Sequence, residues 1–156
     1  MSFLFDYQVY KLASSFYVEY PHFKYPEILS KSPRAYNCIL IDLHMDYFIC
    51  LPFRSDMRHA NGYHFKTTIR SQTHKSGIDY SKMVIISDTK YLDGGVVVDR
   101  DEYLEMVHNI NKIVSDALRY LETYIAHKNG TKILHPNKYF RKYGKSTLPY
   151  FDSIIL

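Results

Sequence analysis

The sequence predicts an α+β fold, a compact single domain in which helices pack on a twisted, mainly antiparallel β-sheet. Three observations lead to this prediction. The 156 residues match the size of one domain, which is expected to span residues 1–156. Between residues 36 and 98, runs rich in β-branched and aromatic residues alternate with polar turns. A long stretch with apolar residues at helical spacing follows near residues 100–127.

The N-terminal half is expected to supply a short helix and most of the sheet. The helix is predicted over residues 8–17, ending before Pro21, with a proline-punctuated connection after it. Residues 36–44 and 46–53 predict an antiparallel hairpin, because a polar break separates two runs rich in Ile, Tyr, Phe and Leu. Further strands are predicted at residues 63–69, 82–86 and 96–98.

The C-terminal half is expected to be helical. Asp99 and Glu102 form a capping-box-like start for the long helix, and Gly130 follows its end at about residue 127. The apolar stripe of this helix requires a sheet to pack against, so the helix should cover one face of the sheet. A last short helix is predicted over residues 136–143, directly before Gly144.

The composition favours a globular protein with an anionic partner. Apolar residues make up 46% and charged residues 23% of the chain, as in ordinary folded domains. The formal net charge is +4, and the cations gather in two segments, residues 54–75 and 131–147. The chain has sixteen Tyr and no Trp. Tyrosine rings either pack half-buried in the fold or stack on unpaired RNA bases, and both interpretations stay open.

Several other classes of protein are disfavoured. The N-terminus lacks a basic region before an apolar run, so neither a signal peptide nor a membrane span is expected. We therefore expect a cytoplasmic protein without a membrane partner, in which Cys38 and Cys50 are reduced and buried in strands. His and Cys form no closely spaced ligand group, and no common nucleotide-binding motif or nucleophile elbow is present. Neither a metal nor another cofactor is predicted.

The segment over residues 52–66 is the strongest candidate for catalysis. It gathers hydroxyl, imidazole and cationic side chains where a strand is expected to end: Arg54, Ser55, Arg58, His59, His64 and Lys66. Cleavage of RNA without a metal needs a base for the 2′-hydroxyl, an acid for the 5′-oxygen, and cations beside the phosphorane. This segment could supply them, although a solvated hairpin loop explains the same residues.

A second segment, residues 74–82, is a candidate for binding phosphate. Hydroxyl, backbone and ammonium donors occur at Ser76, Gly77, Ser81 and Lys82. A plain turn before a buried strand explains this segment equally well.

Four segments of the chain carry a resemblance to a known family: SPRAYNCILIDL (32–43), YFICLPFRSDMRH (47–59), SGIDYSKMVII (76–86) and KYFRKYGK (138–145). In order and approximate spacing they resemble the type III toxin-antitoxin endoribonucleases, typified by ToxN and AbiQ, with CptN and TenpN as the more similar branches. The resemblance implies a core like that of the MazF and Kid toxins and metal-independent cleavage of RNA to 2′,3′-cyclic phosphate ends. It further implies that the toxin processes its own antitoxin transcript and is inhibited by the resulting RNA pseudoknot.

The resemblance also implies roles for individual residues. Arg54 and Ser55 match the Thr-Ser pair that opens the active-site loop of the family, with Arg in place of Thr, and Arg58 is the nearest equivalent of the Lys that follows. Tyr10 or Tyr7 matches an N-terminal Tyr. The expected catalytic residues are Ser55, His59, Arg54, Arg58 and Tyr10. The expected RNA-binding residues are Arg34, Lys66, Lys82, Lys138, Arg141, Lys142 and Lys145.

These expectations combine into one hypothesis for the site. RNA would lie across a positive groove between residues 54–66 and 132–145, with the scissile phosphate near His59 or Ser55. The expected partners are the antitoxin RNA pseudoknot, in a closed hetero-oligomer, and cellular or phage mRNA as substrate. Two alternatives stay open: a non-catalytic RNA-binding module, and a protein–protein interaction domain that uses the tyrosine-rich surface.

Overall fold

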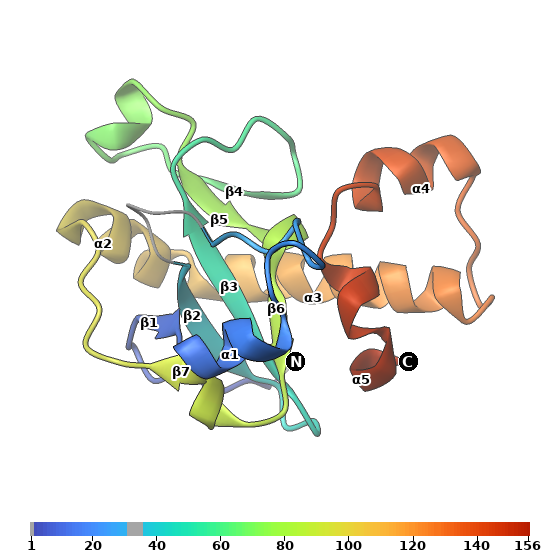
Figure 1. Cartoon of the computed structure of the whole chain (residues 1–156). Helices are drawn as coiled ribbons and strands as arrows, with labels where there is room; N and C mark the ends of the chain where they lie inside the picture. Colours follow the sequence, from blue (N-terminus) through green and yellow to red (C-terminus); the bar gives the residue numbers. More distant parts are fainter. Residues whose placement is uncertain (1, 31–35) are drawn as a thin grey trace.

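The protein has an α+β fold in which helices lie behind and beside a seven-stranded sheet (Figure 1). The computed structural model describes residues 2–30 and 36–156. The strand order is β4-β5-β3-β2-β1-β7, with β6 paired to β3 beside this path. Each of these strand pairs is antiparallel, which confirms the predicted kind of sheet.

The predicted central strands are present, in shorter form. The strands are β1 (Tyr10–Leu12), β2 (Asn37–Asp42), β3 (Phe48–Arg54), β4 (Gly62–His64), β5 (Gly77–Asp79), β6 (Val84–Ile86) and β7 (Leu92–Asp93). The predicted hairpin is confirmed, because β2 and β3 pair antiparallel with Leu40 opposite Cys50. The strands predicted at residues 63–69 and 82–86 correspond to β4 and β6.

Other predictions for this half of the chain were wrong or right only in part: α1 (Ser14–Glu19) confirms the end of the helix predicted over residues 8–17. Residues 10–12 lie not in a helix but in β1, which pairs with β2 on one side and β7 on the other. Ladder hydrogen bonds on both sides favour the extended backbone here, and the partners are distant in sequence. Residues 96–98 are not a strand, and β7 instead ends directly before Gly94 and Gly95. The three-residue strand β5 was not predicted.

The long predicted helix is two helices. The α-helices are α1 (Ser14–Glu19), α2 (Arg100–His108), α3 (Ile110–Lys128), α4 (Pro136–Tyr143) and α5 (Asp152–Ile155). Short 3₁₀ helices occur at Arg70–Gln72, Tyr80–Lys82, Thr89–Tyr91 and Leu148–Phe151. The break falls at Asn109, whose side chain donates to the carbonyl of Glu105 at 2.8 Å and so competes with the helical pattern.

The capping box predicted at Asp99 was also wrong. The Asp99 side chain makes no capping hydrogen bond and pairs instead with Arg70, at 2.7 Å. The prediction of a short helix before Gly144 is confirmed by α4. None of the helices that the structure describes is both long and apolar enough to cross a membrane.

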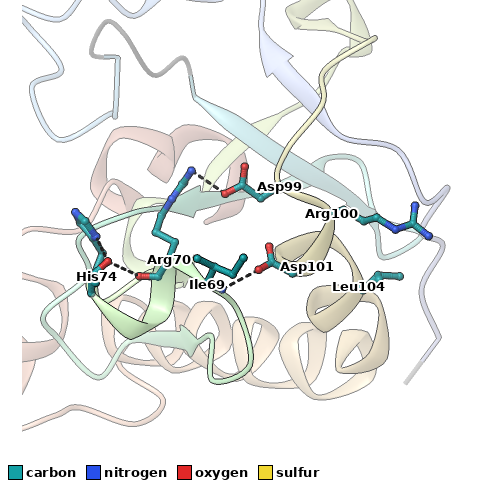
Figure 2. Close-up of a pocket in the computed structure, with 8 residues that line it drawn as sticks. Ile69, Arg70, His74, Asp99, Arg100, Asp101 and Leu104 are labelled. Carbon is teal, nitrogen blue, oxygen red and sulfur yellow. Dashed lines mark hydrogen bonds and ion pairs between the residues drawn. The ribbon is translucent and has the colours of Figure 1, made fainter.

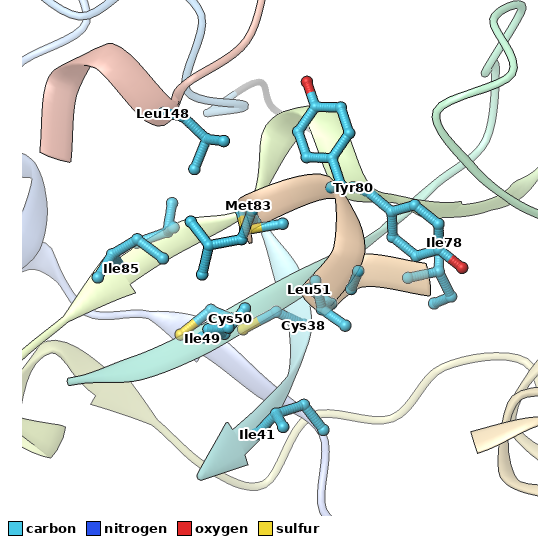
Figure 3. Close-up of a cluster of buried hydrophobic side chains, with 14 of the residues drawn as sticks. Cys38, Ile41, Ile49, Cys50, Leu51, Ile78, Tyr80, Met83, Ile85 and Leu148 are labelled. Atoms are coloured by element: carbon cyan, nitrogen blue, oxygen red, sulfur yellow. The ribbon is translucent and has the colours of Figure 1, made fainter. Parts of the chain in front are cut away.

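The core lies between the central strands and the helices. Figure 3 shows Cys38 and Cys50 among the buried residues Ile41, Ile49 and Leu51. Both cysteines are free and fully buried, as predicted. Burial raises the pKa of the Cys38 thiol well above its ordinary value, so this side chain acts as a small apolar group and not as a thiolate.

Tyrosines fix α4 on α3. Tyr139 and Tyr143 of α4 pack against Tyr124 of α3, and the Tyr143 hydroxyl donates to the carbonyl of Tyr120 at 2.7 Å. The Tyr120 hydroxyl donates back to the carbonyl of Lys142 at 2.8 Å. Because the tyrosine face of α4 is turned to α3, its cationic face is left outside.

Candidate functional site

The buried carboxylate of Asp79, at the end of β5, organises the candidate site. Its Oδ1 accepts hydrogen bonds from the backbone N–H and the hydroxyl of Ser81, at 2.9 and 2.6 Å. Its Oδ2 accepts from the guanidinium of Arg54 at 2.7 Å and lies 3.1 Å from Nε2 of His59. Four hydrogen bonds saturate the carboxylate, and the loop after β3 is thereby tied to β5.

Asp79 is ionised at neutral pH. Burial raises the pKa of this carboxyl, but the hydrogen bonds from His59, Ser81 and Arg54 lower it by more, so the pKa lies below its ordinary value. The fully buried negative charge is thus compensated by the guanidinium of Arg54 and by a hydrogen bond to His59, and both side chains are partly exposed. Both remain accessible to a ligand.

Hydrogen bonds engage both ring nitrogens of His59. Nδ1 accepts the backbone N–H of Asn61 at 3.0 Å, which assigns the proton of the neutral ring to Nε2. Nε2 then donates to Asp79, with the Ser81 hydroxyl 3.3 Å away. In a Ser-His-Asp triad the two partners bind opposite ring nitrogens, whereas here both face the same one. The cluster is therefore not a serine-hydrolase triad.

A cavity of about 210 Å³, here called the His59 cavity, opens beside this cluster. Its lining joins the loop between β3 and β4 to the end of α4, although these segments are far apart in the chain. The lining residues are His59, Asn61, Ser81, Phe140, Arg141, Lys142, Gly144 and Lys145. The structure thus brings part of the first basic segment against part of the second.

Lys142 and Phe140 give this cavity a cation and an aromatic ring. Lys142 is half-buried, forms no ion pair with a described carboxylate, and has its Nζ 5.9 Å from the centre of the Tyr120 ring. Burial first, and then repulsion from Lys138 and Arg119, lower the pKa of Lys142. A bound anion would favour the charged ammonium and so offset both effects. The Phe140 side chain is 72% exposed at the rim.

Three predicted catalytic residues lie outside this cluster. Ser55 follows β3, is half-buried, and is not part of the Asp79 hydrogen-bond cluster. Arg58 is exposed and pairs with Asp56 at 3.3 Å. Tyr10 lies on β1, which β2 and β3 separate from β5, and its hydroxyl donates to Asp6. That hydrogen bond, followed by burial, raises the pKa of Tyr10 to about 12.

The predicted RNA-binding lysines divide between surface and interior. Lys66 and Lys138 are exposed, as are Arg141 and Lys145. Lys82 is buried, and its ammonium donates to Glu27 at 2.6 Å and to the carbonyl of Lys145 at 2.7 Å. We therefore correct its expected role: Lys82 anchors the segment after α4 and is not available to a phosphate. Arg34 lies outside the described residues.

Sequence reasoning missed Asp79, Asn61 and Phe140. Asp79 is a single acidic residue at the end of a very short strand. The residues that pair with it, Arg54 and His59, lie elsewhere in the chain. The sequence pattern around Phe140 is clearer. Tyr139 and Tyr143 define the packed face of the helix, and Phe140 stands among the cations of the same helix.

A larger cavity, of about 740 Å³, lies between the turn at residues 69–74 and the start of α2 (Figure 2). Most of its charged groups are already engaged. Arg70 pairs with Asp99 at 2.7 Å, and Asp101 accepts the backbone N–H of Ile69 at 2.8 Å. This cavity offers a ligand less uncompensated charge than the His59 cavity does.

Among residues 2–30 and 36–156, no three His, Cys, Asp or Glu side chains are grouped so that they could hold a metal ion. The sequence matches no protein-family model and no curated protein, and neither sequence nor fold matches a solved structure.

Proposed function

We propose that the protein is a metal-independent endoribonuclease that acts as the toxin of a type III toxin-antitoxin system. The observation that carries the proposal is the His59 cavity, where an imidazole tied to a buried carboxylate faces the cations of α4. The family resemblance described above and its MazF/Kid-like core belong to the same proposal.

The proposed chemistry uses Asp79 to position two groups. The scissile phosphate binds beside Arg54, whose guanidinium has N–H donors left after its bond to Asp79. When the substrate binds, its 2′-hydroxyl replaces the backbone N–H of Asn61 as the partner of Nδ1 of His59. Nδ1 then takes the proton of this hydroxyl, and Asp79 stabilises the imidazolium that forms. The 2′-oxygen attacks phosphorus, the bond to the 5′-oxygen breaks, and this oxygen leaves with a proton from solvent. The product has a 2′,3′-cyclic phosphate.

RNA fits the surface around the cavity better than a protein partner does. Arg141, Lys142 and Lys145 supply positive charge, and Phe140 supplies an exposed ring on which an unpaired base can stack. Tyrosines, by contrast, mostly serve the fold: the hydroxyls of Tyr36, Tyr63, Tyr120, Tyr124 and Tyr143 all bond to the protein itself.

In this proposal the antitoxin RNA occupies the same surface as the substrate and inhibits by occlusion. Closed complexes of toxin and RNA pseudoknot would then form through this one surface. Competition between a labelled substrate RNA and the antitoxin RNA tests this point. Simultaneous binding of both RNAs to one protein would exclude occlusion.

A non-catalytic RNA-binding module is the second candidate, and one observation favours it. Both ring nitrogens of His59 already have partners, so proton transfer requires the Asn61 contact to open. Catalytic hydrogen bonds often form in full only when the substrate is bound, so the contact in the free protein does not exclude His59 as the base. A pure binding module would retain RNA without forming products.

Expression of single variants in a bacterial host tests the proposed function. Wild-type protein should arrest growth, and His59→Ala should not, although the purified variant should retain RNA with little loss of affinity. Ser55→Ala tests Ser55, which the family resemblance implies, against His59, which the hydrogen-bonded cluster favours. Growth arrest by both variants, at wild-type expression levels, would contradict the proposed site.

A further inference from the structure

A second cavity, of about 290 Å³ and here called the Arg119 cavity, adjoins the His59 cavity. It lies between the residues that lead into β4, the first half of α3 and the end of α4. Its lining includes Asn61, Lys112, Asp116, Arg119 and Lys142. Asn61 and Lys142 also line the His59 cavity. A strand of RNA that fills the His59 cavity can therefore continue into the Arg119 cavity past these two shared residues.

The Arg119 cavity carries a net positive charge. Asp116 is the only acid among the described residues of its lining, whereas Lys112, Arg119 and Lys142 are cations. Lys112 and Arg119 lie on one face of α3, about two helical turns apart, with Asp116 between them. Burial, and then repulsion from Lys138 and Arg119, lowers the pKa of Lys142, so these cations are close enough to oppose one another. A bound anion would offset this repulsion.

The ion pairs of Asp116 leave these cations accessible to a ligand. Asp116 lies 3.0 Å from the ammonium of Lys112 and 3.5 Å from Nη1 of Arg119, and the side chains of both cations are exposed. Exposed pairs of this kind contribute little to stability, so a ligand anion can replace the carboxylate at little cost. The contact through Nη1 also leaves other N–H donors of the guanidinium for a phosphate.

We propose that the Arg119 cavity is a second phosphate-binding subsite, which holds a backbone phosphate of the RNA next to the one that is cut at His59. This phosphate binds the guanidinium of Arg119 and the ammonium of Lys142, and Lys112 adds positive charge beside it. The subsite rests on the proposed function and deepens it. Phosphate contacts fix the position of a strand without reading its sequence, so the subsite holds the scissile phosphate in place at His59 for RNAs of any sequence.

Removing the charge of one phosphate at a time tests the subsite. The probe is a set of short, labelled, single-stranded RNAs with 2′-fluoro groups, which cannot be cut by 2′-hydroxyl attack. Each RNA carries one uncharged methylphosphonate linkage, at a different position in each. Fluorescence anisotropy gives the affinities of the wild type and of Arg119→Gln. We expect one linkage at which the methylphosphonate weakens binding to the wild type roughly tenfold, the loss of one charge-assisted contact. At this linkage Arg119→Gln should lose much less, because it already lacks the contact.

Asp116→Asn should have the opposite effect. Without the competing carboxylate, Lys112 and Arg119 should bind the phosphate more tightly, and the affinity for RNA should rise about threefold. Glu122→Gln is the matched control, because Glu122 is exposed on the same helix but lies outside the cavity lining. It should change the affinity less. Thermal unfolding should give all three variants a Tm close to that of the wild type, since exposed ion pairs contribute little to stability.

Three outcomes would overturn the subsite. If Arg119→Gln loses as much affinity as the wild type at every methylphosphonate, Arg119 contacts no phosphate, while the proposed function stands. If Asp116→Asn and Glu122→Gln raise the affinity equally, the effect of charge is diffuse and the cavity is not a defined site. If the wild-type protein binds none of these RNAs, the proposed function fails, and the subsite with it.

Discussion

At the residue scale, the site depends on the interactions that compensate the negative charge of Asp79. The carboxylate is fully buried, and its partners are Arg54, the last residue of β3, and His59, in the loop that follows. A buried charge that loses a partner is costly, so the interaction fixes both side chains at the mouth of the cavity. The interactions that hold the proposed catalytic groups in place therefore also stabilise the fold.

Asp79→Asn should destabilise the protein by roughly 3 kcal/mol, because the amide presents a donor where Arg54 or His59 also donates. Urea unfolding measures the loss, and RNA cleavage should fall with it. Asp56→Asn is the matched control, since Asp56 forms only an exposed pair with Arg58 and should have no measurable effect. Equal unfolding midpoints for wild type and Asp79→Asn would contradict this account of the cluster.

The sequence allowed the exposed members of the site to be predicted better than the buried one. Arg54 and His59 were predicted because a hydroxyl, imidazole and guanidinium cluster stands out locally. Asp79 was missed because its partners lie some 20 residues away along the chain, at separations of 25 and 20 positions. Lys82 was predicted as a phosphate ligand, but its partner Glu27 is still more remote, 55 positions away along the chain.

At the scale of elements, α4 carries the positive surface. Its two faces have different tasks: Tyr139 and Tyr143 pack on α3, while Lys138 and Arg141 point to solvent. Lys82 fixes the segment that follows, through the carbonyl of Lys145. The helix can therefore lose surface cations without losing its position.

The variant Arg141→Gln/Lys145→Gln should weaken RNA binding and reduce its salt dependence. If each side chain contacts one phosphate, the slope of log K against log salt should decrease by about 0.7 for each cation removed, or about 1.4 in total. Lys24→Gln/Lys90→Gln removes the same charge from exposed positions outside the cavity lining and should change the slope little. A similar slope change in both variants would indicate a diffuse charge effect and no defined contact surface.

The elements that could be predicted are those with a strong local pattern. The β2–β3 hairpin and α4 have clear alternation or helical spacing, and both are present. β1 and β5 are three residues long and owe their extended form to pairing with distant segments. The break at Asn109 was also missed, because the apolar spacing continues across it from α2 to α3.

At the scale of the whole molecule, two carboxylates link stability to pH. Burial raises the pKa of Asp79 and of Glu105, but hydrogen bonds lower each by more, so both pKa values lie below their ordinary values of 3.8 and 4.5. For Glu105 the main donors are Thr67, Tyr63 and Lys66. A lowered pKa stabilises the folded state above the unfolded value, and this contribution disappears as the pH falls through the folded value.

The free energy of unfolding should therefore be steady near neutral pH and decrease progressively below about pH 4.5. Urea unfolding between pH 3 and 7 measures this profile. The variant Asp79→Asn/Glu105→Gln should be less stable at pH 7 and show a flatter acid limb. An acid limb as steep as that of the wild type would mean that other carboxyls cause the loss.

The same architecture explains why the fold class could be predicted and the site only in part. Strand and helix patterns are local, whereas the Asp79 cluster and the His59 cavity require β3, β5 and α4 to meet. The two basic segments were visible in the sequence, but the carboxylate beneath them was not.

The most direct test of the central claim is to incubate purified wild-type protein and His59→Ala with mixed-sequence RNA in EDTA, and to map the cut ends and their terminal phosphates. The account predicts 2′,3′-cyclic phosphate ends with the wild type and intact RNA with His59→Ala, although both proteins bind the RNA. RNA left intact by the wild type, or cut equally by both proteins, would contradict a metal-independent ribonuclease centred on His59.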